Sequence, residues 1–179
     1  MVKPVLIIAG AIPVILAILI AVPMITKPDI PFSAVVPTDK IELEYAKHQL
    51  QKISFGVTEE TKSQKTEILV IKDDGIVRYT VIEKGSSQPD KRSTIGEEKI
   101  RKLTALIKET GFMAIPSESF PVGDDITQYK KSSLKVTLNG QTKQIHWPEQ
   151  NATSQFLPPI ITMVELELDQ IISDIQNSN

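Results

Sequence analysis

The longest hydrophobic stretch of the sequence runs from Val5 to Ile25 and contains no charged side chain. As a helix, these residues would span about 31 Å, close to the roughly 30 Å thickness of a bilayer's hydrocarbon core. A helix that packs inside a soluble protein is usually shorter and apolar on one side only. The pattern therefore predicts a transmembrane anchor within residues 1–25, in contact with the lipid bilayer through residues 5–25.

A cleaved signal peptide is the alternative interpretation of this stretch. Its apolar region would be about 7 to 15 residues long and would end in a small-x-small cleavage site. The observed stretch is longer and no Ala-x-Ala triplet follows it, so an uncleaved anchor is favoured. Lys3 precedes the span, whereas Lys27 and Asp29 follow it. This charge bias favours a cytoplasmic N-terminus, so we expect a single-pass cell-membrane protein whose C-terminal domain lies outside the cytoplasm.

The residues after the hydrophobic stretch divide into a spacer and a domain. Residues 26–40 contain Pro28, Pro31 and Pro37. Proline favours extended backbone, so this segment is predicted to be a semi-rigid spacer. Residues 41–179 mix polar and apolar positions at the periods of strands and helices, which predicts one soluble domain.

The first segment of the domain has two interpretations. A capping-box pattern at its start and apolar residues at helical spacing, Leu43, Ala46 and Leu50, predict a short helix from about Ile41 to Gln51. Lys52 to Val57 fits the beginning of a strand instead. The boundary between helix and strand is left open.

A β-hairpin is predicted next. The β-rich segments Thr66 to Lys72 and Ile76 to Glu83 flank Asp73-Asp74-Gly75. Asp-Gly between such segments is a strong hairpin signal, because glycine supplies the positive φ of the turn. The loop has either two or three residues, and this choice decides which face of the first strand lies opposite the second. Gly85 to Arg92 follows as a polar surface loop.

A second hairpin is centred on Asn139-Gly140, with alternating apolar residues on both sides. A two-residue type I′ turn pairs Leu138 with Gln141 and Leu134 with Ile145. Ile145 and Trp147 then share a face with Leu134.

Two helices complete the domain. Thr94 and Glu97 form a capping-box pattern before the first helix, which ends at Gly111. Pro158-Pro159 precedes the second helix. Their buried stripes are Ile100, Leu103 and Ile107 in the first, and Ile161, Val164, Leu168, Ile171 and Ile175 in the second. The order of elements predicts an α+β fold, a small antiparallel sheet of two hairpins with helices packed on one face.

From about Thr66 to Ile172 these features resemble a widespread family of small exported domains of unknown function. The matching segments are IKDDGIVRY at 71–79, the helix end ETGF at 109–112, Ile115, Phe120, an aspartate at 124 or 125, the hairpin SLKVTLNGQTKQI at 133–145 and the proline-led last helix. Ser54-Phe55-Gly56 stands where such domains often have a cysteine-glycine segment. The resemblance implies an exported α+β domain and implies no activity. The anchor, the spacer and the lack of cysteine also resemble archaeal proteins.

Composition narrows the functional classes. The net charge is −2, so no global field attracts nucleic acid, and we expect no nucleic-acid partner. The absence of cysteine excludes disulfides, thiolate metal sites and cysteine nucleophiles. His48 and His146 are far apart and lack metal-ligand spacing, and no serine lies in a recognised catalytic motif. We therefore predict no catalytic residue, no cofactor and no metal.

Two weaker candidates for a site remain. Glu118, Asp124 and Asp125 lie in the loop 117–125, where paired carboxylates would serve a small exported hydrolase or metal-dependent enzyme. Calcium-loop spacing is absent, so a solvated loop is favoured. Trp147 is expected in the core, although an exposed Trp147-Pro148 would make a docking patch. The leading hypothesis is a non-enzymatic, membrane-anchored protein-binding domain, an accessory subunit with a membrane-protein partner.

Overall fold

The computed structural model describes residues 35–117 and 120–177, which lie within one compact unit, Pro31–Asn179. The predicted anchor and residues 26–34 of the predicted spacer lie outside the described residues. Within the described part, no helix has the length and hydrophobicity needed to cross a bilayer. The last residues of the spacer form a turn in which the Asp39 amide donates to the Val36 carbonyl at 2.9 Å.

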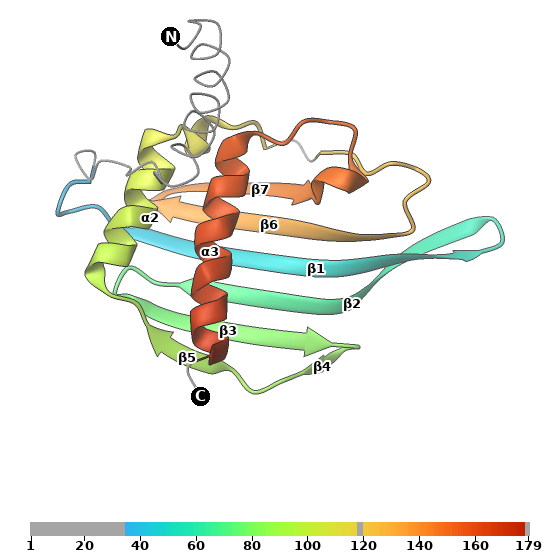
Figure 1. The fold of residues 1–179 in the computed structure, drawn as a ribbon, viewed down its shortest axis with the longest axis horizontal. Coiled ribbons are helices and arrows are strands. Elements are labelled where there is room, and N and C mark those ends of the chain that lie inside the picture. The colour runs from blue at the N-terminus through green and yellow to red at the C-terminus, as the bar shows by residue number, and fades with distance from the viewer. Residues whose placement is uncertain (1–34, 118–119, 178–179) are drawn as a thin grey trace, which may run out of the picture. The chain divides into compact units, whose positions relative to one another are not determined.

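The described residues contain one antiparallel sheet of seven strands (Figure 1). The strands are β1 Ile41–Phe55, β2 Thr58–Ile71, β3 Ile76–Glu83, β4 Ser86–Ser87, β5 Lys91–Thr94, β6 Gln128–Leu138 and β7 Gln141–Pro148. Their order is β4-β3-β2-β1-β6-β7, and β5 pairs with β3. The predicted antiparallel α+β class is confirmed, and the sheet is larger than the two predicted hairpins.

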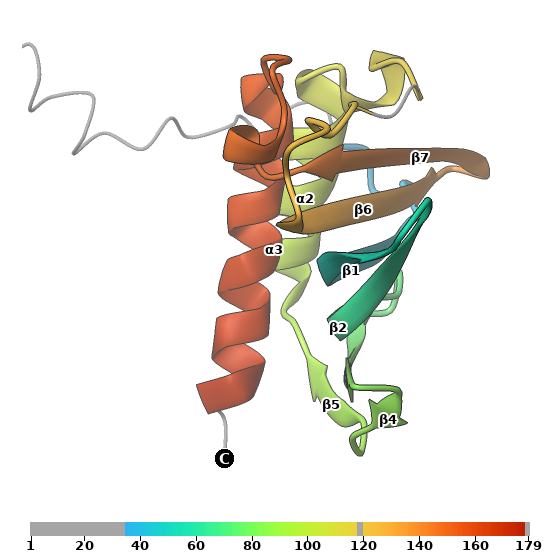
Figure 2. The same ribbon diagram turned by 90° about the vertical axis from the view of Figure 1, so that its right-hand side faces the viewer.

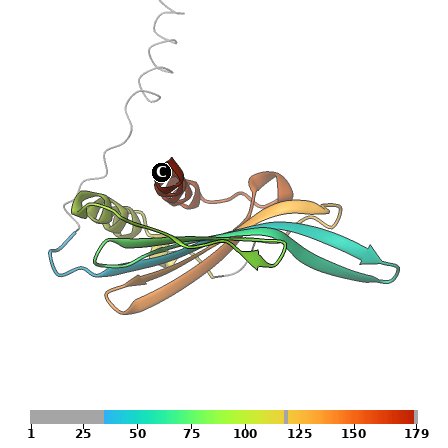
Figure 3. The same cartoon turned by 90° about the horizontal axis from the view of Figure 1, so that it is seen from below.

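Two α-helices, α2 Glu97–Glu109 and α3 Pro159–Asn177, lie on the same face of this sheet (Figures 2 and 3). Two short 3₁₀ helices, η2 Phe112–Ala114 and η3 Gln150–Ala152, lie in the connections. The core forms between the helices and one face of the central strands. Its sheet side includes Leu43, Tyr45, Leu69, Ile71, Val77, Tyr79, Leu134, Val136, Ile145 and Trp147. We call the helix-covered face the inner face and the opposite face the outer face.

The predicted helix from Ile41 to Gln51 is wrong, because this segment is the central strand β1. Ile41, Leu43 and Tyr45 are buried and the residues between them are exposed, which is a period of two. β1 pairs with β2 on one side and with β6 on the other. Pairing on both edges and burial of alternate residues outweigh the helical spacing of the local sequence.

The first predicted hairpin has a three-residue loop. The Lys72 amide donates to the Ile76 carbonyl, and the Gly75 amide donates to the Lys72 carbonyl, both at 3.0 Å. Ile71 pairs with Val77, so Leu69 and Ile71 belong to the buried face. A Cβ on Gly75 would lie 2.7 Å from the Ile95 carbonyl oxygen, at a φ of +80°. Glycine is therefore required at this turn.

The second predicted hairpin is confirmed. Asn139 and Gly140 have φ values of 50° and 82°, as a type I′ turn requires, and Leu134 pairs with Ile145. The Asn139 side chain accepts a hydrogen bond from the Lys40 amide at 2.9 Å and donates to Asp39 at 2.7 Å. The turn is thereby joined to the start of β1.

The region between β3 and α2 differs from the prediction. Gly85 to Arg92, expected to be a loop, contributes β4 and the start of β5 to the sheet edge. Thr94 ends β5, and the N-cap of α2 is Gly96, which makes no side-chain capping bond. At the other end, Gly111 is left-handed with φ of 71°, as predicted. Phe112 next to it is buried, as a hydrophobic contact at a helix end requires.

Candidate functional site

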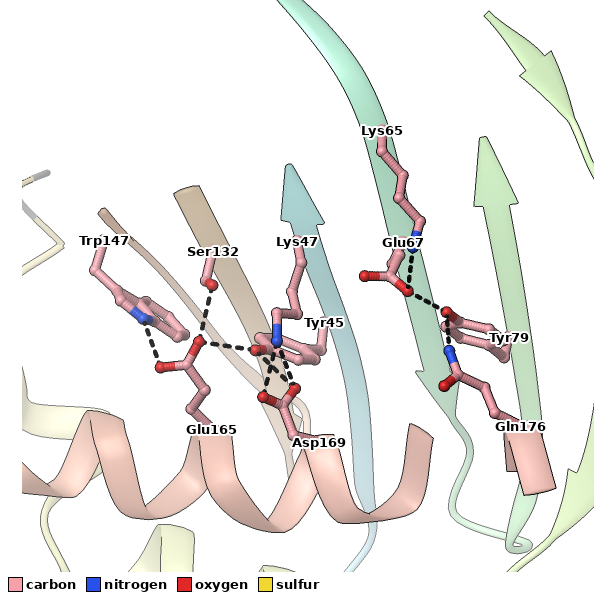
Figure 4. Close-up of polar contacts among 10 residues, drawn as sticks. All are labelled: Tyr45, Lys47, Lys65, Glu67, Tyr79, Ser132, Trp147, Glu165, Asp169 and Gln176. Carbon is pink, nitrogen blue, oxygen red and sulfur yellow. Dashed lines mark hydrogen bonds and ion pairs between the residues drawn. The ribbon is translucent and has the colours of Figure 1, made fainter. Parts of the chain in front are cut away.

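Helix α3 presents two stripes to the sheet, an apolar one and a polar one. The predicted apolar stripe, from Ile161 to Ile175, is buried as expected. Glu165 and Asp169 lie beside it, one turn apart, and therefore point from the same flank of the helix. This flank faces side chains of β1, β6 and β7 (Figure 4).

The Glu165 carboxylate accepts hydrogen bonds from three strands. The Tyr45 hydroxyl of β1 and the Ser132 hydroxyl of β6 each donate to Glu165 Oε1 at 3.0 Å. The Trp147 indole N–H of β7 donates to Oε2 at 3.4 Å. The Tyr45 and Trp147 rings also stack, with centroids 6.4 Å apart. Glu165 thus joins α3 to three neighbouring strands through one side chain.

Asp169 makes the next contact along α3. Lys47 Nζ lies 2.8 Å and 3.0 Å from its two oxygens, and Tyr45 donates to Oδ1 at 3.3 Å. Burial, together with the negative charges of Glu165 and Asp169, raises the pKa of Tyr45 well above its usual range. The Tyr45 hydroxyl is therefore a hydrogen-bond donor at neutral pH and not a base.

A second polar group lies further along α3, around Tyr79 of β3. Tyr79 donates to Glu67 and accepts from the Gln176 amide at 2.8 Å, while Lys65 contacts Glu67 at 3.2 Å. Burial and then the bond to Glu67 raise the pKa of Tyr79. Burial opposes ionisation of Glu67, but the bonds from Tyr79 and Lys65 outweigh it and lower the Glu67 pKa. This carboxylate is charged and has its donors in place.

These contacts identify the polar stripe as a structural link between helix and sheet. Every carboxylate in it accepts from a hydroxyl, an indole or an ammonium group. Ser132 donates to a carboxylate and has no histidine beside it, so the nucleophile–base pair of a hydrolase does not form among these residues.

A hollow of about 640 Å³ opens beside the Glu165 end of this stripe, between α3, β6, β7 and η3. Its apolar lining includes Pro148, Leu157 and Met163, and Lys47 and Glu165 contribute polar groups. Phe156 lies at the same hollow with 76% of its surface exposed. The volume falls in the range of ligand pockets in proteins, about 300 to 1,000 Å³.

The structure places the predicted contact residues at this hollow but not on the surface. Trp147 is only 1% exposed and fills the core, as expected, so the exposed docking patch centred on its side chain is wrong. Pro148, the last residue of β7, is also buried and lines the hollow. The physical reason is register, because Trp147 lies opposite Ser132 on the inner face, beneath α3.

The predicted acidic residues lie elsewhere. Asp124 and Asp125 are exposed and do not line the hollow, and Glu118 lies outside the described residues. Within residues 35–117 and 120–177, no three His, Asp or Glu side chains gather closely enough to hold a metal ion. The neighbouring Gly123 amide donates to the Ala152 carbonyl at 3.0 Å, which fixes the loop to η3.

Both histidines lie on the outer face of the sheet. His48 Nδ1 is 3.0 Å from the Thr66 hydroxyl. Burial, followed by the charges of Lys131 and His146, lowers the His48 pKa, and burial followed by Lys131 lowers that of His146. Both rings are therefore neutral at pH 7.

Sequence reasoning missed Glu165, Asp169, Tyr45 and Ser132. One signal was present, because Glu165 and Asp169 flank the apolar stripe of a predicted helix at a spacing of four residues. Their partners are far away in sequence, however, with Tyr45 120 residues before Glu165. Comparison of the sequence with protein-family models and with curated proteins finds no match. The resemblance to a family of exported domains therefore stays a prediction.

Proposed function

We propose that this chain is a membrane-anchored protein-binding domain outside the cytoplasm, an accessory subunit whose partner is another membrane protein. The observation that carries the proposal is the hollow beside Phe156. A large exposed aromatic side chain next to an apolar pocket is a typical feature of protein interfaces, where aromatic residues and methionine are enriched. The anchor and the orientation come from the sequence pattern of residues 1–40.

The lining of the hollow supports recognition of a protein side chain. Pro148, Leu157 and Met163 offer apolar surface, while Lys130 and Glu149 at its border carry charges of both signs. An apolar centre with a polar rim is the usual anatomy of a protein interface. A partner would insert an apolar side chain and make polar contacts around it.

The link between α3 and the sheet supports a preformed site. Glu165 lines the hollow and is held by donors from β1, β6 and β7. Because these bonds already hold the lining of the hollow in place, binding does not have to order it. The entropic cost of association is therefore lower.

The experiment is affinity purification of the full-length protein from native membranes in mild detergent, with mass spectrometry of the co-purifying proteins. The wild type should recover a membrane protein in stoichiometric amount. Phe156→Ala should lose most of this partner, because truncation of a central interface residue costs about 2 kcal/mol or more, roughly 30-fold in affinity.

The control is Leu166→Ala. Leu166 is also a large exposed apolar residue, at 65%, and lies on α3 outside the hollow. The Leu166→Ala variant should retain the partner. Recovery of the protein alone, or equal recovery of the same partner with both variants, would contradict the proposal.

A further inference from the structure

A cluster of positive charge lies on the outer face, where β2, β3 and β5 meet. Lys72, Arg78 and Arg92 surround a hollow of about 340 Å³ whose apolar surface comes from Val70 and Ile76. Since Val77 and Tyr79 point into the core, alternation along β3 places Ile76 and Arg78 on the opposite face.

The register brings two of these charges together. Arg78 of β3 lies directly opposite Arg92 of β5. Like charges in such a cross-strand pair destabilise a sheet. Among the described residues, no carboxylate oxygen lies within 4 Å of the charged group of Lys72, Arg78 or Arg92. The two arginines thus lie side by side without a direct ion pair among the described residues, and the nearby Asp90 carboxylate accepts from Thr80 instead.

The chemistry of this cluster fits phosphate oxygens. The planar guanidinium group binds phosphate in a bidentate manner, and two adjacent guanidinium groups with an ammonium present a concentrated positive surface. Ile76 lies among them and is 45% exposed. An apolar side chain surrounded by cations is suited to a membrane interface, where cations contact headgroups and the apolar group enters the acyl boundary.

The cluster also lies at the end of the sheet where the chain enters the domain. Ile41, the first residue of β1, pairs with Leu138, and Leu43 pairs with Ile71 next to Lys72 (Figure 1). Residues 26–40, the predicted spacer, extend to at most about 50 Å. With an anchor at residues 5–25, this end of the sheet can reach the bilayer surface.

We propose that Lys72, Arg78 and Arg92 bind phosphate-bearing headgroups of the membrane that anchors the chain, with Ile76 entering the interface. This inference rests on the anchor in the proposed function. It is independent of the hollow beside Phe156, which lies on the other face of the sheet. Contact with lipid would give the tethered domain a defined orientation, with the inner face presented to a partner.

The test uses the full chain in nanodiscs of phosphatidylcholine with and without phosphatidylglycerol. The protein has no cysteine, so Ile76→Cys creates a single site for a fluorophore whose emission reports an apolar environment. A blue shift is expected at position 76 in anionic nanodiscs. No shift is expected for Val57→Cys, a fully exposed position at the β1–β2 turn.

Introducing Arg78→Gln and Arg92→Gln into the labelled Ile76→Cys variant should remove most of the blue shift. At about 1 kcal/mol for each basic residue near an anionic surface, the ratio of bound to free domain falls about 30-fold. The matched control, Lys62→Gln with Lys102→Gln, removes the same charge from a lysine at the β1–β2 hairpin and from one on α2, on the opposite side of the sheet from the cluster. It should retain the shift.

Each other result overturns the proposal. If the protein co-elutes with the nanodiscs but shows no shift at position 76, headgroup binding is contradicted and the anchor is not. If the protein does not co-elute with the nanodiscs, the anchor is contradicted as well. An equal shift in both lipids would exclude a role for charge. A shift produced by inorganic phosphate without anionic lipid would identify free phosphate as the ligand.

Discussion

The charged side chains on the two faces of the sheet differ in their hydrogen-bond and ion-pair partners. On the inner face, Glu67, Glu165 and Asp169 each accept hydrogen bonds from neighbouring side chains. On the outer face, Arg78 and Arg92 lie opposite each other, and neither forms an ion pair with a described carboxylate. Buried charges must be paired to be tolerated, whereas two like charges directly opposite each other on a sheet cost stability. The inner charges are therefore structural, and the outer ones are candidates for binding.

Trp147→Ala should have the largest effect. The side chain is buried, stacks on Tyr45 and donates to Glu165, so its removal leaves a large cavity in the inner face. We expect a loss of about 4 kcal/mol in the free energy of unfolding, measured by urea denaturation. Leu166→Ala, on the exposed surface of α3, should change it by less than about 0.5 kcal/mol. Similar effects of the two variants would contradict the assignment of Trp147 to the core.

Glu165→Ala should destabilise the domain by about 3 kcal/mol, because the buried Ser132 hydroxyl and Trp147 indole would lose their acceptor. Tyr45 would keep only its longer bond to Asp169. Glu165→Gln keeps an acceptor oxygen and should lose less. Urea denaturation of both variants measures the difference. An unchanged stability for Glu165→Ala would mean that the polar stripe does not hold α3 on the sheet, and its carboxylate would then be free for another role.

Asp39 predicts a dependence of stability on pH. Its bonds from Lys108 and Asn139 lower its pKa to about 2. A carboxyl whose pKa is lower in the folded state contributes stability above its unfolded pKa, near 3.8, and loses this as the pH falls through about 2. Asp39→Asn should therefore reduce stability by about 1 kcal/mol at pH 6 and by much less at pH 2. Urea denaturation at both pH values measures this difference. An equal loss of stability at pH 6 and pH 2 would exclude the Asp39 charge as the cause.

Arg78→Gln with Arg92→Gln should have the smallest effect on stability. Relief of the cross-strand repulsion is expected to leave the domain unchanged or to stabilise it by about 0.5 kcal/mol. Its unfolding can be compared with that of Lys62→Gln with Lys135→Gln, which breaks two surface ion pairs. A loss of more than about 1 kcal/mol would show that the two arginines are structural after all.

Local chemistry made some parts of this fold predictable from sequence. Asn139-Gly140 and Gly111 need a positive φ that few other residues tolerate, so each marks its turn or helix end directly. The stripe of α3 is also local, because it repeats every three to four residues. β1 was not predictable in this way, since its identity as a strand depends on two neighbours that lie in other parts of the chain.

The candidate site was less predictable than the fold. Glu165 meets Ser132 and Tyr45 only after β1, β6 and α3 have assembled. Phe156 is one of five phenylalanines in the sequence, and nothing next to it indicates that it stays exposed. β5 was missed because the edge strand Lys91–Thr94 is short and polar, as edge strands commonly are.

The proposed function requires the hollow beside Phe156 to bind a protein partner. The most direct measurement is hydrogen exchange of the full-length protein while it is bound to the partner recovered from native membranes, compared with the same protein after release. Partner-dependent protection should be concentrated in residues 148–163. Protection confined to the loop 120–127 or to the β1–β2 hairpin, with no change around Phe156, would contradict it.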